Sequence, residues 1–236
     1  MKAGLISVVL PVHNQADHLA AVVTEYVAAL NPLAKSYEVI LVANNCRDNT
    51  WEVCQALVAK YPGVRALQSA VGGWGLAVKL GLGAAQGDLI CYTNSARTSG
   101  EDLAQLITLA TAQPDTVIKA NRKIRESFGR RLGSLIYNLE CRALFDLATW
   151  DINGTPKVFP RRFAKLMTLS RDDDLIDAEF AALCRREGYP VLEVPIFSTR
   201  RHGGKSTTGW RSALRMYVGA WKLRQQLDES GARAKT

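Results

Sequence analysis

The stretch LISVVLPVHNQADHLAAVVTEYVAALNPLAKSYEVILVAN, residues 5–44, decides the fold. It begins with a short β-branched run over 5–11, ended by a proline, which predicts a fully buried strand. Apolar residues at 19, 22, 23, 26, 27 and 30 then predict an amphipathic helix over 16–30. A second buried strand is predicted over 37–44. The two strands are expected to run parallel, because a helix connects them.

The same alternation continues to about residue 122. Helices are predicted over 47–61, 75–86 and 101–113, the first with a cap at 48 or 50, and strands over 64–69, 87–93 and 116–122. Five such alternations indicate an α/β fold with a doubly wound, mostly parallel sheet and flanking helices, similar to a Rossmann fold. Such sheets bind ligands at the carboxyl ends of their strands, which are here residues 11–15, 42–48, 93–97 and 119–122.

The second half of the chain predicts helices over 130–148 and 174–189, a turn and strand over 151–163, and a strand over 190–201. A basic, glycine-containing loop over 202–209 then precedes a last helix over 210–229. No internal repeat or low-complexity linker separates the two halves. We therefore expect one domain over 1–229, including the C-terminal amphipathic helix, and a frayed tail over 230–236.

Composition limits the classes of partner and compartment. The 30 Lys and Arg exceed the 22 Asp and Glu, and the net charge of +8 suits an anionic partner or serves solubility alone. Five cysteines without a C-x-x-C pair argue against a disulfide framework or a zinc site. The N-terminal apolar run is too short for a signal peptide, and no window approaches the roughly 18 apolar residues of a membrane span. We expect a cytoplasmic protein.

Eight motifs occur in order along the chain: VVLPVHNQ (8–15), VANNCRDNT (42–50), GGWGLAVKLGL (72–82), DLICYTNSARTSGEDL (88–103), KANR (119–122), DINGTPKVFPRRF (151–163), LIDAEFAALCRREGYPVLEVPI (175–196) and RRHGGKS (200–206). Together they resemble the family 2 glycosyltransferases with a GT-A fold, and in particular the dolichol- and polyprenol-phosphate sugar synthases. The resemblance covers residue 6 to about 220. It implies a hexosyltransferase that moves a sugar from a nucleotide-diphosphate sugar to a polyprenol phosphate or related acceptor.

The carboxylates that bind the donor or its metal in that family are neutral here. Ala43 and Asn44 replace two Asp, Thr93–Ser95 replaces the D-x-D motif, and Gln15 replaces a Glu. Hard divalent cations prefer carboxylate oxygens, so a Mg or Mn site is disfavoured and no cofactor is expected to be required. Arg97 is the candidate to neutralise the leaving diphosphate in place of the metal. The alternative is a solvated loop arginine.

The resemblance implies donor-binding residues at the strand ends, at the glycine turn and in the basic loop. Turn structure alone is the alternative for the asparagines and glycines, and a disordered surface loop is the alternative for 202–209. Mobile glycines beside cations instead suit a lid over a diphosphate. The candidate donor-binding residues are Pro11, Val12, Asn14, Asn44, Gly73, Gly75, Lys79, Asn94, Ser95, Arg201, Lys205 and Ser206.

Acceptor and catalytic residues are expected in the second half. The resemblance assigns the acceptor phosphate to Arg122, Arg131 and Ser134, although basic runs are usually only solvated. A lipid phosphate is already ionised, so the remaining carboxylates would orient groups rather than remove a proton. Turn or cap roles are their alternative. The candidate catalytic residues are Asp151, Asp177, Glu179 and Arg97.

The C-terminal helix combines an apolar, aromatic face with basic flanks. It predicts either packing onto the sheet or contact with an anionic membrane surface, peripheral on the inner face of the membrane. A catalytically degenerate GT-A module that binds nucleotide or a protein partner without turnover is the main alternative function. Nucleic-acid binding is disfavoured, because the cations gather at loop ends and on the last helix rather than along one stripe.

Overall fold

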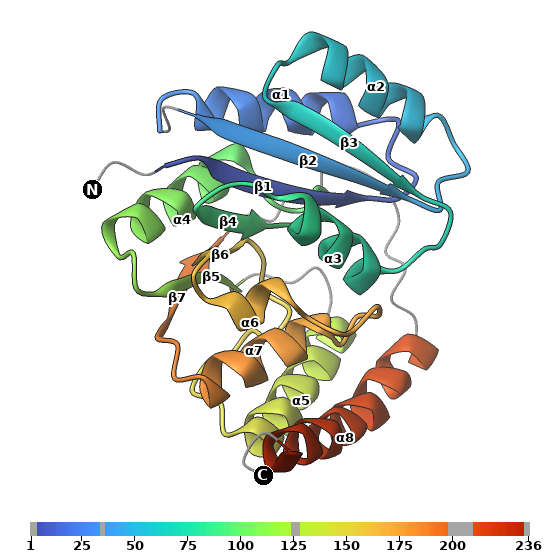
Figure 1. The fold of residues 1–236 in the computed structure, drawn as a ribbon. Helices are drawn as coiled ribbons and strands as arrows, with labels where there is room; N and C mark the ends of the chain where they lie inside the picture. The colour runs from blue at the N-terminus through green and yellow to red at the C-terminus, as the bar shows by residue number, and fades with distance from the viewer. Residues whose placement is uncertain (1–3, 34–35, 124–127, 198–209, 234–236) are drawn as a thin grey trace.

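The computed structural model describes residues 4–33, 36–123, 128–197 and 210–233. Within them, seven strands form one sheet in the order β3-β2-β1-β4-β6-β5-β7 (Figure 1). Neighbours are parallel, except that β6 is antiparallel to β4 and β5, so the predicted mostly parallel α/β sheet is confirmed. The strands are β1 (Ile6–Val12), β2 (Tyr37–Asn44), β3 (Val64–Ser69), β4 (Leu89–Tyr92), β5 (Val117–Arg122), β6 (Lys157–Pro160) and β7 (Val191–Ile196).

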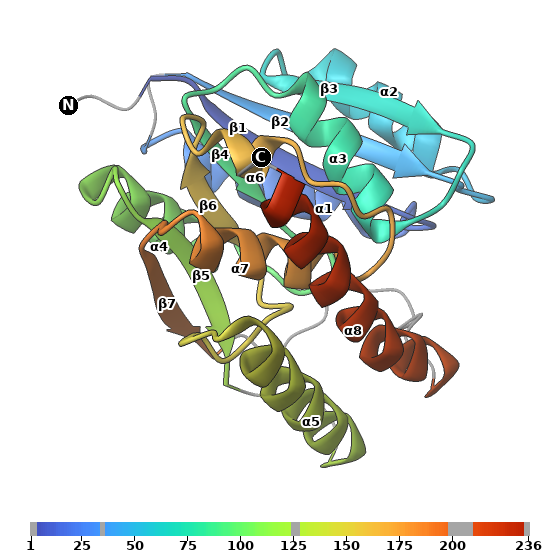
Figure 2. The same cartoon turned by 60° about the horizontal axis from the view of Figure 1, so that its bottom comes forward.

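Helices cover both faces of the sheet (Figures 1 and 2). One face packs against α1 (Leu19–Leu30), α2 (Thr50–Lys60) and α4 (Gly100–Ala112). The other face packs against α3 (Trp74–Ala84), α6 (Ala164–Met167) and α7 (Ile176–Arg186). Two further helices, α5 (Phe128–Phe145) and α8 (Trp210–Arg233), lie together at the end of the molecule away from α2.

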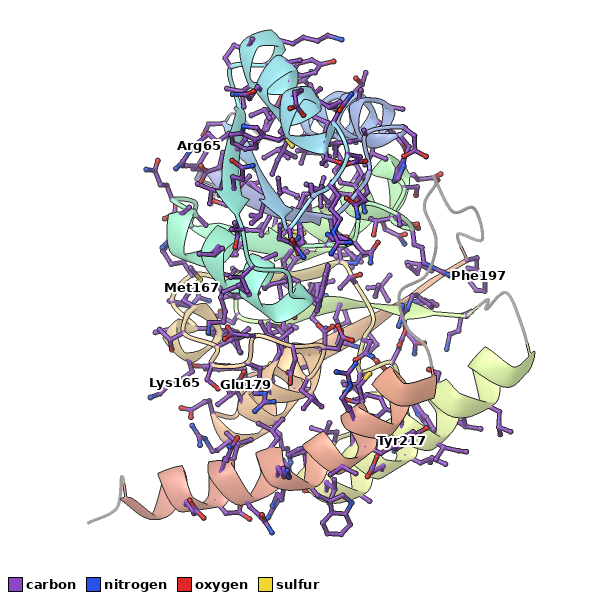
Figure 3. The ribbon with its side chains drawn as sticks, turned by 90° about the vertical axis from the view of Figure 1, so that its right-hand side faces the viewer. Arg65, Lys165, Met167, Glu179, Phe197 and Tyr217 are labelled. Atoms are coloured by element: carbon purple, nitrogen blue, oxygen red, sulfur yellow. The ribbon has the colours of Figure 1, made fainter. Side chains whose placement is uncertain are left out.

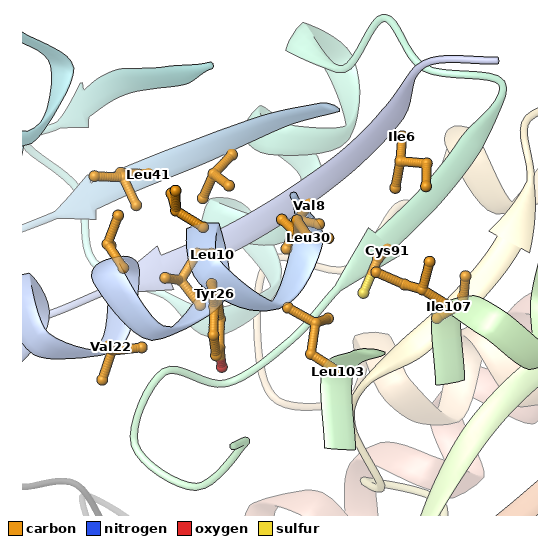
Figure 4. Packing of buried hydrophobic residues seen from close by; sticks show 14 of the residues in the cluster. Ile6, Val8, Leu10, Val22, Tyr26, Leu30, Leu41, Cys91, Leu103 and Ile107 are labelled. Atoms are coloured by element: carbon orange, nitrogen blue, oxygen red, sulfur yellow. The ribbon is translucent and has the colours of Figure 1, made fainter. Parts of the chain in front are cut away.

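The central strand β1 is buried along its whole length because both of its faces are covered. Val8 and Leu10 point to the layer of α1 and α4, whereas Val9 points to the layer of α3. Figure 4 shows Tyr26 of α1 within the first layer. Its hydroxyl donates to the Thr98 carbonyl at 3.0 Å, which fixes the turn that follows β4.

Within the described residues the last helix packs mainly against other helices, and Leu227 near its end also contacts the cluster on the α3 side of the sheet. Met216, Ala220 and Leu223 are buried in a cluster with residues of α5 and α7. A Cβ at Gly219 would lie 2.4 Å from a methyl carbon of Leu175, so glycine permits this close approach. Tyr217 lies between α8 and α5 (Figure 3), and its hydroxyl donates to a carbonyl of α5 at 2.7 Å.

Several boundaries differ from prediction. The second helix begins at Thr50, and the side chain of the predicted cap residue Asp48 accepts from the Thr50 N–H at 3.2 Å. The strand in 151–163 is confined to β6 and inserts antiparallel between β4 and β5, a pairing that no local pattern predicts. The last helix continues to Arg233, so residues 230–233 are helical rather than frayed. No helix in the described ranges is both long and apolar enough to cross a bilayer.

Candidate functional site

The candidate site lies along the carboxyl edge of the sheet. Strand order reverses between β1 and β4, because β2 and β3 lie on one side of β1 while β4 and the later strands lie on the other. Such a switch point is where open α/β sheets bind their ligands. The prediction that the carboxyl ends of β1, β2, β4 and β5 lie at one edge of the sheet is therefore confirmed.

At the end of β2, Asn44 links three segments. Its side-chain nitrogen donates to the Val12 carbonyl at 2.9 Å, and its oxygen accepts from the Gly73 N–H at 3.2 Å. Pro11 and Val12 are buried. Asn14 is exposed with a φ of 51°, a left-handed conformation that asparagine tolerates better than most residues. The buried amide of Asn44 thus holds the edge together, and the exposed Asn14 is itself engaged, because its side-chain oxygen accepts from the Arg47 N–H at 2.7 Å.

The segment in place of the D-x-D motif forms hydrogen bonds within the protein. The hydroxyls of Thr93 and Thr98 are 2.7 Å apart, and both residues are buried. The Ser95 hydroxyl donates to the Gln15 side chain at 2.5 Å. The Asn94 side chain accepts from a backbone N–H two residues later. Hydroxyl and amide groups already engaged in this way are a poor set of ligands for Mg or Mn.

No cluster of three or more potential metal-binding side chains occurs among the residues that the structure describes. The hydroxyl and amide side chains at 93–95, already bonded within the protein, are poorly suited to a divalent cation. Arg97 follows them in the same turn and is half-buried, with its backbone N–H 3.4 Å from the Asn94 carbonyl. The structure thus puts Arg97 in the turn after β4, and its role toward a diphosphate stays a prediction.

The glycine turn at the start of α3 packs against the backbone of 171–173. A Cβ at Gly75 would lie 2.5 Å from the Arg171 carbonyl oxygen, and one at Gly73 would lie 2.7 Å from the Asp172 oxygen. Lys79 reinforces this contact, since its ammonium donates to the Ser170 carbonyl and to the Asp172 carboxylate. The glycines are therefore required for approach of this loop, independently of any role in donor binding.

Glu179, from the first turn of α7, binds the same loop from the other side. Its carboxylate accepts from the backbone N–H groups of Ser170 and Arg171 and from the Ser170 hydroxyl, at 2.6 to 3.0 Å. Glu179 is also buried. These contacts indicate a residue that positions loop 170–173 over α3, and any direct part in the chemistry remains a prediction.

Asp177 forms the centre of a buried polar cluster. It accepts from the Trp74 indole at 3.1 Å and from the Tyr92 hydroxyl at 2.9 Å, and it pairs with Lys157. Lys157 is fully buried, and burial, partly offset by Asp177, lowers the pKa of its ammonium to about 8. The cluster connects α3, β4, β6 and α7. Asp177 thereby sets the orientation of Trp74 at the rim of the edge.

A second cluster lies beside it, at the end of β5. Asp151 accepts from the Arg122 backbone N–H and, bidentately, from its guanidinium, at 2.8 to 2.9 Å. Burial would lower the pKa of Arg122, but the Asp151 carboxylate outweighs it and the pKa is raised. Asp151 itself is 2% exposed, whereas the Arg122 side chain is 24% exposed. The pair presents a fixed, permanently charged guanidinium at this edge.

Behind this pair lies a buried lysine. Lys119 donates to the Asp151 carbonyl at 2.5 Å and to the Glu193 carboxylate at 2.7 Å. Burial alone would raise the pKa of Glu193, but Lys119 overrides it and the pKa is lowered. Lys119 and Lys157 are direct cross-strand partners. The three cations of the two clusters are matched by three carboxylates, so these six groups carry no net charge.

For four of the predicted site residues, either the whole residue or its side chain lies outside the described part of the chain. Arg201, Lys205 and Ser206 lie outside the described residues, as does the whole loop 202–209. Arg131 is in the first turns of α5, but its side chain is likewise not described. Ser134, one turn later in α5, is half-buried. The proposed lid and part of the acceptor site therefore remain predictions.

Sequence reasoning missed Lys119, Lys157, Glu193 and the tie between Trp74 and Asp177. A signal for the lysines existed, because TVIKANR and PKVFP each place a lysine directly beside apolar residues of a strand. Buried lysines are rare unless paired, so such a position indicates a buried carboxylate partner. The identity of that partner depends on tertiary contacts.

Comparison with known proteins agrees with this geometry. The family model described as glycosyl transferase family 2 matches residues 7–170. The undecaprenyl-phosphate 4-deoxy-4-formamido-L-arabinose transferase of Serratia proteamaculans (strain 568) is 30% identical over 168 residues, 69% of this chain and 51% of that protein. The protein of the same name in Sodalis glossinidius (strain morsitans) is 24% identical over 210 residues, 87% of this chain and 63% of that protein. The chain thus spans less than two thirds of the length of these relatives.

Among solved structures, glucosyl-3-phosphoglycerate synthase from Mycobacterium tuberculosis, in complex with Mn2+, UDP and glucosyl-3-phosphoglycerate, has a TM-score of 0.71 at 17% sequence identity. The alignment covers 94% of this chain and 80% of that one. A mycobacterial protein of known structure gives a TM-score of 0.73 at 18% identity, over 94% of this chain and 74% of that one. At these identities the likeness establishes the fold alone.

Proposed function

Because the chain belongs to glycosyl transferase family 2, we propose that it transfers a sugar from a nucleotide-diphosphate sugar to a polyprenol phosphate, without a divalent cation. One observation carries the proposal. The switch-point edge has a fixed guanidinium, Arg122, held by Asp151, while the positions of the family's metal-binding acids carry hydroxyls and amides. An anionic acceptor suits a guanidinium that is held in a fixed orientation at this edge. The names of the curated relatives support the lipid-phosphate acceptor.

Transfer of the sugar to a phosphate needs neither a general acid nor a general base. An oxygen of the acceptor phosphate attacks the anomeric carbon of the sugar, and the bond from that carbon to the diphosphate oxygen breaks. The nucleoside diphosphate leaves with the electron pair. No proton moves, because the attacking phosphate is already ionised. The chain must therefore hold two anions in line and stabilise the charge that develops on the leaving diphosphate.

We assign these tasks to two arginines. Arg122, oriented by Asp151, holds the acceptor phosphate, since a guanidinium with a fixed orientation suits the planar arrangement of phosphate oxygens. Arg97, in the turn after β4, neutralises the leaving diphosphate. Asn14 and the neighbouring strand ends are assigned to the nucleoside. Asp177 and Glu179 act as positioning residues through Trp74 and loop 170–173.

The test combines donor binding with product formation. Thermal shifts would be recorded with UDP-, GDP-, CDP- and dTDP-sugars, with magnesium or manganese and with a chelator, and transfer would be measured to a short-chain polyprenyl phosphate. We expect one donor to stabilise the protein and to be consumed in the presence of chelator. Activity that disappears with chelator and returns with metal would overturn the metal-free proposal.

Arg97 can be tested separately from the fold. Arg97→Ala is expected to abolish transfer, and Arg97→Lys to restore only part of it, because a lysine lacks the planar fork. Arg162→Ala is the matched control, since Arg162 is exposed, pairs with Asp115 at the surface and is distant in sequence from Arg97. Full activity of Arg97→Ala would remove Arg97 from the mechanism.

A second candidate function is favoured by one specific feature. The hydrogen bond between the Thr93 and Thr98 hydroxyls, and the one from Ser95 to Gln15, satisfy within the protein groups that could otherwise bind a nucleotide sugar. A module that binds nucleotide without turnover would show the same feature. Stabilisation by a nucleotide sugar, with no product from any donor in the panel, would select this alternative.

A further inference from the structure

The two helices at the end of the molecule away from α2 carry large apolar side chains on their outer side. On α5 these residues recur at one-turn spacing, and on α8 they are neighbours on the surface. Each is 44 to 59% exposed. We define the α5–α8 face by these residues: Leu132, Leu135, Ile136, Leu139, Val218 and Trp221.

The spacing of the exposed apolar residues on α5 shows that they form a continuous stripe along one side of the helix. Residues 132, 135, 136 and 139 follow the i, i+3, i+4, i+7 pattern of a single helical stripe. The opposite side of α5 already buries Tyr137, Cys141 and Phe145 in the core of this end of the molecule. The helix is therefore apolar on two sides, and only one of these sides has a partner within the described residues.

The α8 helix continues the same surface. Its own buried side faces α5 and α7, and Arg224 donates to the Leu144 carbonyl of α5 at 2.6 Å. Trp221 lies one turn after Tyr217, whose hydroxyl donates to the Gly133 carbonyl of α5. Burial raises the pKa of Glu140, the only acid in the sequence of α5. The one carboxylate of α5 is half-buried and does not lie fully exposed among the apolar residues of the face.

Basic residues surround the apolar ones. Arg142 lies three residues after Leu139 on α5, and its guanidinium stacks 3.9 Å from the centre of the exposed Trp150 ring. On α8, Arg215 and Lys222 lie three residues before and four residues after Val218, and both are exposed. An apolar stripe edged by cations and tryptophans is the composition of a helix pair that lies in a membrane interface.

We infer that the α5–α8 face docks on an anionic bilayer surface, with α5 as the main contact. Charge decides against a second copy of the chain as the occupant, because two such faces would bring Arg142, Arg215 and Lys222 against each other. The inference rests on the proposed function for its purpose, since β5, which ends at Arg122, leads into α5. It goes beyond that function by locating the contact on α5, whereas the sequence suggested only the last helix.

The decisive experiment measures the partition of the full chain onto vesicles of phosphatidylcholine, with and without phosphatidylglycerol. We expect binding that requires phosphatidylglycerol. Leu135→Glu with Ile136→Glu should lower the partition coefficient about tenfold or more, because two apolar contacts become charges of the lipid's own sign. Arg215→Gln with Lys222→Gln should lower it about fivefold for each cation removed.

Matched controls are available on other helices. Val58 of α2 and Leu80 of α3 are each 39% exposed and lie outside this face, so Val58→Glu and Leu80→Glu should leave vesicle binding unchanged. Circular dichroism confirms that each variant is folded. Transfer to a soluble short-chain polyprenyl phosphate should persist in Leu135→Glu with Ile136→Glu. If the proposed function is wrong but the membrane inference is right, the wild-type protein will bind vesicles and will not transfer sugar to the soluble acceptor.

Three outcomes would overturn the inference. The first is the absence of wild-type binding to vesicles that contain phosphatidylglycerol. The second is undiminished vesicle binding by the double variant Leu135→Glu with Ile136→Glu. The third is a dimer in light scattering that dissociates in this variant, because the face would then be an interface between copies of the chain.

Discussion

Replacing Lys157 with methionine tests the buried cluster around Asp177. The substitution preserves the length and most of the volume of the side chain but removes a fully buried ammonium. Asp177, which is 4% exposed, keeps its bonds from Tyr92 and Trp74 but loses its countercharge. Removing one partner of a buried ion pair costs about 3–5 kcal/mol. For a chain of this size that corresponds to a fall in Tm of about 6–20 °C.

The assay is urea unfolding followed by tryptophan fluorescence, with Lys60→Met as the control. Lys60 is exposed at the end of α2, and its loss should change the free energy of unfolding by less than about 0.5 kcal/mol. The double variant Lys157→Met with Asp177→Asn removes both charges and keeps an oxygen for Trp74 to bind. It should recover more than half of the lost stability, since an uncompensated buried charge no longer remains.

Two results would refute this reasoning. A loss below about 1 kcal/mol in Lys157→Met would mean that the ion pair contributes no more than a typical surface pair. A double variant whose loss equals the sum of the two single losses would mean that the two groups are not coupled.

Two further predictions concern the same edge of the sheet. Gly154→Ala should cost more than about 3 kcal/mol in the same assay, because its Cβ would lie 2.0 Å from the Ala120 carbonyl oxygen and the backbone must move. Asp151→Asn removes the bidentate carboxylate that orients the Arg122 guanidinium. It should raise the KM for the polyprenyl phosphate at least tenfold and leave the KM for the sugar donor unchanged, as measured by steady-state kinetics with both substrates varied. Equal changes in the two KM values would contradict this prediction.

The neutral side chain of Asn44 at the switch point has a structural role. Asn44 replaces a carboxylate with a group that both donates and accepts, and it uses both abilities to join β1 to the glycine turn. An aspartate could not donate to the Val12 carbonyl. The change of residue type therefore stabilises this edge without a metal, whichever function it serves.

Local patterns were sufficient for the elements and for the edge. The buried runs of β1 and β2 and the six buried positions of α1 follow directly from hydrophobic periodicity, and parallel connection then brings the strand ends together. The positions where the family's acids are neutral are likewise visible in the sequence. Each of these features depends on residues within one or two turns or on a single crossover.

Tertiary structure decided how the charges are matched. Lys119, Lys157 and Glu193 lie on three different strands. Pairing of β5 with β7 sets Glu193 beside Lys119, and Lys157 joins them only because β6 inserts antiparallel between β4 and β5. Likewise, the sequence of α5 shows an apolar helix, but only its packing shows which stripe is left exposed. Burial and charge pairing depend on segments distant along the chain, so no window of sequence contains the information that selects one partner over another.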